Sequence, residues 1–264
     1  MITELLERSF AKMGARVKFG EIMPRRGVPS RDLVLDVGVD RDGEYFEIRR
    51  LNRSLPELVV LDVQPRERHL LLLSRDGREK HRFLLGHDER HWFVAGIPEI
   101  TPVSRVRDAM RALKPEVVLA SESRIRSKYR DRRANAVRVR QGEWFFVPAL
   151  VSRFDKFLVL RNEPLVRSRG GKPHMCEELY RFGGETVYVS PAAPNGLTEE
   201  EYRALSPRER QRSNWRVMKR NPKVYVRGRV RHSDHATVVL DGWHEVLMNT
   251  ENLSVAMKDV VFLD

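Results

Sequence analysis

The chain of 264 residues contains a single cysteine, Cys176, which excludes a disulfide within the chain. A lone thiol is typical of proteins from a reducing compartment. Long apolar runs are also missing, since the longest ones, such as Leu70 to Leu73, are far too short to cross a bilayer. The first residues do not resemble an apolar leader, because Glu4 and Glu7 interrupt them. We therefore expect a cytoplasmic protein with no membrane partner.

Acidic residues are outnumbered by basic ones. The 37 Asp and Glu residues stand against 49 Lys and Arg residues, which leaves a net charge of +12 at pH 7. With 41% apolar and 33% charged residues, the composition indicates a folded protein with a heavily charged surface and excludes wholesale disorder. Such a basic balance favours an acidic partner, either RNA or DNA or the acidic surface of another protein.

The first half of the chain is dominated by short β-prone runs. Residues 1–100 are predicted to form a domain in which a helix over Thr3 to Met13 precedes an antiparallel meander. Turn pairs such as Asp76-Gly77 mark its hairpins, because Asp-Gly readily adopts the positive φ of a tight turn. Residues 101–136 are rich in helix formers and in arginine, and we expect them to form a basic helical bridge.

The β-pattern returns in residues 137–264, which are predicted to form a second domain, mainly antiparallel, that contains the His and Cys residues discussed below. Two helices are expected to interrupt its strands. They begin at Thr198 and Ser206, each of which stands three residues before a glutamate, the spacing of a capping box. The predicted fold class is therefore α+β and β-rich.

Positive charge is concentrated in two segments, Arg124 to Arg140 and Arg203 to Arg231, with eight and eleven basic residues against one acidic residue each. Such a density suits a phosphate backbone, and Trp215 and Tyr225 could stack on bases. We expect the two segments to flank one groove, although solvated helix faces are an alternative because no nucleic-acid-binding motif accompanies them. The predicted nucleic-acid contacts are Arg124, Arg126, Lys128, Arg130, Arg132, Arg133, Arg138, Arg140, Arg216, Lys219, Arg220, Arg227 and Arg229.

The cysteine and four of the eight histidines lie within residues 173–249. His174 and Cys176 are two residues apart, as are His232 and Asp234, and residues two apart on a strand share a face. If the two segments pair, these side chains offer mixed N, S and O ligands for a tetrahedral zinc, or three ligands and an open position for water. The predicted metal ligands are His174, Cys176, His232 and Asp234.

The same residues also permit chemistry without a metal, in which His235 or His244 activates the thiol of Cys176 and Asp234 orients the imidazole. The predicted catalytic residues are therefore His235, His244 and Cys176. Neither spacing matches a strong zinc motif, so a structural interpretation stays open. In that interpretation, residues 232–235 form a polar turn and Cys176 is a small buried apolar side chain.

These observations leave three classes of function open. The first is a nucleic-acid-binding protein that uses its Arg-rich segments on a β-rich scaffold. The second is a hydrolase or nuclease with a His/Cys/Asp site, for which zinc is the candidate cofactor. The third is an interaction module for an acidic protein partner, which would use the same basic surface.

Overall fold

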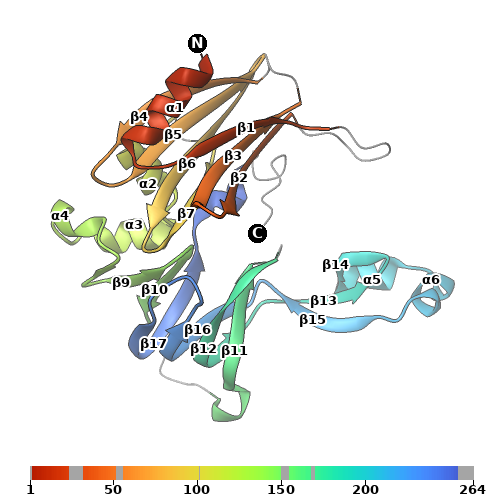
Figure 1. Cartoon of the computed structure of the whole chain (residues 1–264). Helices are drawn as coiled ribbons and strands as arrows, with labels where there is room; N and C mark the ends of the chain where they lie inside the picture. The colour runs from red at the N-terminus through yellow and green to blue at the C-terminus, as the bar shows by residue number, and fades with distance from the viewer. Residues whose placement is uncertain are drawn as a thin grey trace.

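The structure is a computed structural model (Figure 1), and it describes residues 2–23, 32–51, 56–100, 102–149, 155–167 and 170–254. These residues form an α+β protein that is rich in β-structure, which confirms the predicted class. In Figure 1 the N-terminal sheets lie above and the large C-terminal sheet lies below. No helix among the described residues is long and apolar enough to span a membrane.

The N-terminal part begins with α1 (Ile2–Lys12), as predicted, and this helix buries Leu6 and Phe10. A three-stranded sheet follows, ordered β1 (Val17–Glu21), β3 (Gly43–Arg50) and β2 (Leu33–Asp40). Strands β2 and β3 form the expected antiparallel hairpin. Strand β1 departs from the meander because it pairs with β3 instead of its sequence neighbour β2, and so runs parallel.

The next four strands form a continuous antiparallel meander of β4 (Glu57–Gln64), β5 (His69–Asp76), β6 (Glu79–Asp88) and β7 (His91–Ile97). Both faces of this sheet are covered. Leu70 and Leu72 pack with α1 and the first sheet, whereas Leu71 packs with α2 (Val106–Ala112) on the other side. Burial on both faces explains why β5 is a continuous apolar run instead of an alternating one.

Helices α3 (Glu116–Glu122) and α4 (Ser127–Arg130) continue from α2 and surround a buried charge cluster. Lys114 Nζ lies 2.8 Å from Glu122 Oε2, and Arg138 Nε lies 2.8 Å from Glu122 Oε1. All three side chains are buried, with side-chain exposures of 8%, 3% and 2% in that order. This cluster, called the buried ion trio below, joins the helical segment to the C-terminal sheet.

The C-terminal sheet has seven antiparallel strands in the order β11, β12, β16, β17, β10, β9 and β8. Its core is apolar and includes Trp144, Phe146, Cys176, Leu179 and Val226. Two short 3-10 helices accompany the sheet, η1 (Lys156–Leu158) and η2 (Thr250–Leu253). The strands are β8 (Ala134–Asn135), β9 (Arg138–Gln141), β10 (Trp144–Pro148), β11 (Leu160–Arg167), β12 (Gly170–Phe182), β16 (Lys223–Arg231) and β17 (Val238–Met248).

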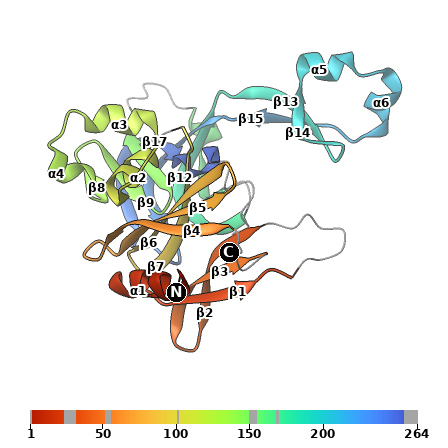
Figure 2. The same ribbon diagram turned by 90° about the horizontal axis from the view of Figure 1, so that it is seen from above.

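Residues 185–220, called the arm below, project from this sheet between β12 and β16, as Figures 1 and 2 both show. The arm contains a small sheet ordered β14 (Ala193–Thr198), β13 (Glu185–Ser190) and β15 (Arg216–Arg220). It also contains the two predicted helices, α5 (Glu199–Ala204) and α6 (Pro207–Arg212). Both helices begin with the expected capping box, which confirms that part of the prediction.

Candidate metal centre

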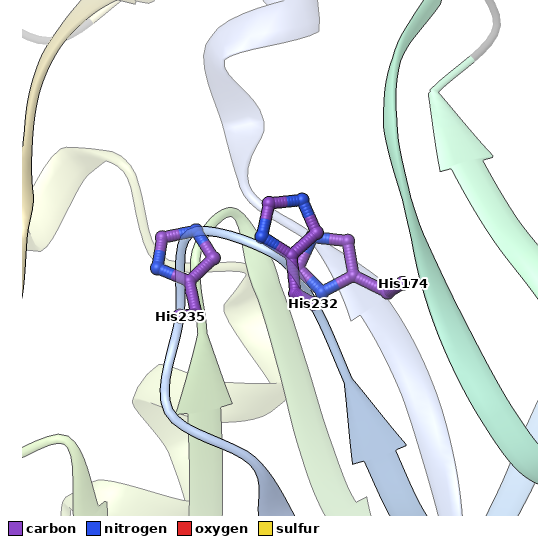
Figure 3. A group of neighbouring side chains, drawn as sticks. All are labelled: His174, His232 and His235. Carbon is purple, nitrogen blue, oxygen red and sulfur yellow. The ribbon is translucent and has the colours of Figure 1, made fainter.

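Three histidines from two segments meet at one end of the C-terminal sheet (Figure 3). Arg231 pairs with Met175 across β16 and β12, so the next residue along, His232, faces His174. The loop after β16 then brings His235 back to the same place. Ring centroids are 4.1 Å apart for His174 and His232, and 4.7 Å apart for His232 and His235. One nitrogen from each ring lies within 4.8 Å of the others, and the three rings are stacked with interplanar angles of 21° to 27°. The rings must turn slightly before all three nitrogens can lie about 2.0 to 2.1 Å from one zinc ion.

The proton of His174 is placed by a buried glutamine. The amide nitrogen of Gln141 donates to the carbonyl oxygens of Val230 and Ala236, at 3.2 and 2.8 Å. Its Oε1 therefore faces His174 Nδ1 at 3.0 Å and accepts a hydrogen bond from the N–H at that position. The lone pair of His174 is left on Nε2, which makes this nitrogen the available ligand atom.

The other two rings also have an oxygen acceptor beside one nitrogen. His232 Nε2 donates to the carbonyl oxygen of Lys172 at 3.2 Å, while its Nδ1 accepts from the backbone N–H of Asp234 at 3.1 Å. His235 Nδ1 is buried without a hydrogen bond and lies 3.7 Å from Glu89 Oε1. Histidines that bind metals usually have such an outer partner, which fixes the ring and its tautomer.

The environment of His232 and His235 favours their neutral form. Burial lowers the pKa of His232 below its ordinary value, and the neighbouring His174 and His235 lower it further. Burial is also the main reason that the pKa of His235 is lowered, although the nearby Asp88 and Glu89 oppose the shift. A neutral imidazole is the form that coordinates a metal, so the lowered pKa values of His232 and His235 favour binding near pH 7.

The hairpin turn between β9 and β10 supplies space and a carboxylate. Gly142 has a φ of +58°, and a Cβ at this position would lie 2.9 Å from His235 Nε2 and 3.4 Å from His174 Cε1. A larger residue would therefore crowd the cluster. Next in sequence, Glu143 places its Oε2 3.7 Å from His174 Nε2, within reach of an ion bound there.

The cluster joins His174 and His232 of the predicted ligands with His235, in place of Cys176 and Asp234. Cys176 shares a face with His174 but lies two residues further along β12, inside the apolar core. The carboxylate of Asp234 turns to Lys172 Nζ, at 2.9 Å, and only its backbone N–H contacts His232. Burial opposes the ionisation of Asp234, but its hydrogen bonds with Lys172 and Ser233 outweigh burial and lower its pKa.

The predicted catalytic residues do not form one group in the described part of the chain. His235 belongs to the cluster, whereas His244 lies on β17 and places its Nδ1 3.0 Å from the carbonyl oxygen of Gly242. Burial raises the pKa of the Cys176 thiol to about 12, which disfavours the thiolate that a nucleophile requires.

We expect Cys176 to resist alkylation in the folded protein. With a pKa of about 12, roughly one thiol in 10⁴ is ionised at pH 8, and the sulfur is fully buried. Iodoacetamide should label Cys176 only after denaturant unfolds the chain, as mass spectrometry would detect. Rapid stoichiometric labelling of the native protein would contradict this expectation and would make Cys176 a candidate nucleophile again.

A cleft of about 220 Å³ lies beside the cluster, between β7 and the C-terminal sheet. His235, Glu143 and Asp234 line one side, and His91 and Phe93 of β7 line the other. Clefts between structural units are common ligand sites, so a bound metal would have a space for substrate next to it.

The glutamine, the glycine and the two glutamates around the cluster were not predicted from the sequence. Gln141, Gly142 and Glu143 lie about thirty residues before His174 in sequence, and Glu89 lies earlier still. The hairpin itself could be anticipated from the glycine between two β-prone runs. No local pattern, however, indicates that this turn reaches the histidines, because that contact depends on the strand order of the sheet.

The first basic segment is partly internal. Arg138 is 2% exposed and belongs to the buried ion trio, so it is not available to a nucleic acid as predicted. Arg133 pairs with Glu89 at 2.5 Å, and Arg140 pairs with Asp88 at 2.9 Å. Arg130 donates to two backbone carbonyl oxygens. The exposed members of this segment are Arg124, Arg126, Lys128 and Arg132.

The second basic segment runs through the arm and along β16. Arg220 pairs with Glu185, Arg227 with Glu178 and Arg229 with Glu177, at 2.5, 2.5 and 3.2 Å. Lys219 donates to Thr186 Oγ1, whereas Arg216 is exposed. In both Figures 1 and 2, α4 and the arm lie at opposite ends of the molecule, so the cations of α4 and those of the arm do not face each other across a groove.

Comparison with known proteins gives no relative from which a role for these residues could be taken. The chain matches no protein-family model, no curated protein and no solved structure.

Proposed function

We propose that the protein is a metal-dependent hydrolase in which His174, His232 and His235 bind a zinc ion. The observation that carries this proposal is the convergence of three ring nitrogens within 4.8 Å. Gln141, Lys172 and Glu89 place an oxygen beside one nitrogen of each ring. An ion bound to His232 Nδ1 would replace the hydrogen bond that this nitrogen accepts from the backbone N–H of Asp234. Three imidazole ligands suit zinc, which is borderline soft and prefers four ligands.

The chemistry follows from the number of ligands. Three protein ligands leave one position of a tetrahedral zinc for water, and zinc lowers the pKa of that water to about 7. Glu143 lies near the ligand nitrogen of His174, where its carboxylate can hydrogen-bond that water or complete the ligand shell. His235 and Glu143 both line the adjoining cleft, so a substrate in the cleft would lie next to the bound ion.

The direct test is to strip the protein of metals, add zinc and measure both binding and hydrolysis. We expect one zinc per chain in competition with a chromogenic chelator. Zinc-dependent cleavage of p-nitrophenyl acetate or bis(p-nitrophenyl) phosphate should accompany binding. A chain that binds no zinc contradicts the site, whereas a chain that binds zinc but cleaves neither ester contradicts the hydrolase assignment.

Replacing Gly142 by alanine should weaken zinc binding by about 10- to 100-fold, similar to the loss of an outer partner at other metal sites. The added methyl group would lie 2.9 Å from His235 Nε2 and push this ring away. Zinc titration of the purified variant measures the effect.

Gly77 provides a matched control for that substitution. It has a φ of +54°, nearly the same backbone conformation, and no atom lies within 4 Å of a Cβ built on it. Gly77→Ala and Gly142→Ala should therefore lose about 1 to 2 kcal/mol each from backbone strain. Only Gly142→Ala should lose zinc affinity, and equal affinities in the two variants would refute the crowding argument.

A further inference from the structure

The arm has a defined shape of its own, away from the rest of the molecule (Figures 1 and 2). Tyr188 of β13 stacks on Tyr202 of α5, with ring centroids 3.9 Å apart and an interplanar angle of 4°. Trp215 meets the edge of this pair at 5.2 Å and donates its indole N–H to the carbonyl oxygen of Arg210. Together with the capping boxes of both helices, this small aromatic core gives α6 and β15 fixed positions.

Positive charge is concentrated along one part of the arm. Residues 207–220 contain six basic residues and a single acidic one, Glu209, for a local net charge of +5. The carboxylate of Glu209 forms the capping box with Ser206. The hydrogen bond from the Ser206 side chain is the main cause of its lowered pKa. The segment therefore presents an excess of cations at the end of a projecting structure.

Three of these cations make no side-chain hydrogen bond or ion pair within the described residues, although the charge of Arg212 helps to lower the pKa of Glu209. They are Arg208, Arg212 and Arg216, and all three are exposed. Arg208 and Arg212 are four residues apart on α6 and so lie on one face of it. Arg216 begins β15 after three intervening residues. The first basic segment also has four exposed cations, but two of them, Lys128 and Arg132, lie over the ring of Tyr129.

We propose that the arm binds a nucleic acid through its phosphates, and that Arg208, Arg212 and Arg216 are the principal contacts. Guanidinium groups hold phosphate oxygens in a two-pronged geometry, and six basic residues against one acidic residue match the regular negative charge of a phosphate backbone. Carboxylates fit the same geometry, so competition with polyglutamate separates a nucleic acid from an acidic protein. Exposed Val217 and Met218, at 66% and 52%, lie beside them and offer apolar contact to sugars or bases. Binding of this kind is independent of sequence, because phosphate contacts do not read bases. The proposal goes beyond the hydrolase assignment and does not rest on it.

The test compares two triple variants that each lose three exposed arginines. The first is R208A/R212A/R216A on the arm. The control, R124A/R126A/R132A, removes the same charge at the opposite end of the molecule. Binding of a labelled mixed-sequence 30-nucleotide DNA, single-stranded and as a duplex, is followed by fluorescence anisotropy. EDTA is present throughout, so the result does not depend on the metal centre.

The arm variant should bind more weakly than the wild type, and its plot of log K against log salt should be shallower by about 2 to 2.7, or roughly 0.7 to 0.9 for each lost contact. The control variant should keep the wild-type slope. The proposal is overturned if neither DNA binds at low salt, if the control loses as much affinity as the arm variant, or if polyglutamate displaces the DNA as well as unlabelled DNA does. Circular dichroism melts of both variants check that the fold is kept.

Discussion

Replacing Glu122 by glutamine is expected to destabilise the protein by about 3 to 5 kcal/mol, the usual cost of breaking a buried ion pair from one side. The two carboxylate oxygens of Glu122 bind Lys114 and Arg138 separately, and all three side chains are buried. Burial lowers the pKa of Arg138, and Glu122 is the main group that opposes this shift. A glutamine keeps the shape but removes the negative charge between the two buried cations, and Lys114 retains only its ion pair with Asp131, at 2.9 Å.

Urea unfolding of Glu122→Gln measures this loss, and Glu57→Gln is the matched control. Glu57 pairs with Arg75 at 3.4 Å, but both side chains are largely exposed, so breaking that pair should cost less than about 1 kcal/mol. If the two variants are equally stable, the buried ion trio does not hold the helical segment against the C-terminal sheet.

His232→Ala should reduce zinc affinity by more than the roughly 10- to 100-fold expected for an outer partner, because it removes one of three ligands. Hydrolysis should fall to the rate without metal. His232 is half-buried and does not belong to the apolar core, so the fold should survive its loss. Zinc titration and a thermal melt of the same sample separate a lost ligand from a lost fold.

His81→Ala serves as the control for a general effect of removing a histidine. His81 lies on β6, pairs with Glu99 at 3.2 Å and is outside the cluster. Its loss should leave zinc affinity unchanged. Equal zinc affinities of His232→Ala and the wild type would mean that His232 is held only by Lys172 and Asp234 and binds no ion.

Features encoded by a few neighbouring residues were predictable from sequence. The helix at the N-terminus follows from apolar spacing, and the helices of the arm follow from the glutamates three residues after Thr198 and Ser206. The Asp-Gly turns mark hairpins that the structure contains, such as the one between β5 and β6. In each case the residues that determine the structure are only a few positions apart in the sequence.

Features that depend on strand register and burial were not predictable in the same way. The pairing of Arg231 with Met175 sets His232 against His174, and a shift of one residue would turn these side chains to opposite faces. The composition of the Arg124 to Arg140 segment suggests an exposed surface, yet Arg138 is buried because Glu122 from α3 compensates its charge. The sequence shows that Arg138 is charged, but only the packed structure shows that Glu122 is its partner.

The arm is an insertion within a hairpin. Phe182, the last residue of β12, is the cross-strand partner of Lys223, the first residue of β16, so the chain leaves and rejoins the sheet at adjacent positions. Gly183 and Gly184, with φ of +71° and +83°, allow the chain to turn out of the sheet there. A tight turn could join β12 directly to β16 without altering the register that aligns His232 with His174. The arm and the histidine cluster can therefore evolve separately, with changes in the length or charge of one leaving the geometry of the other intact.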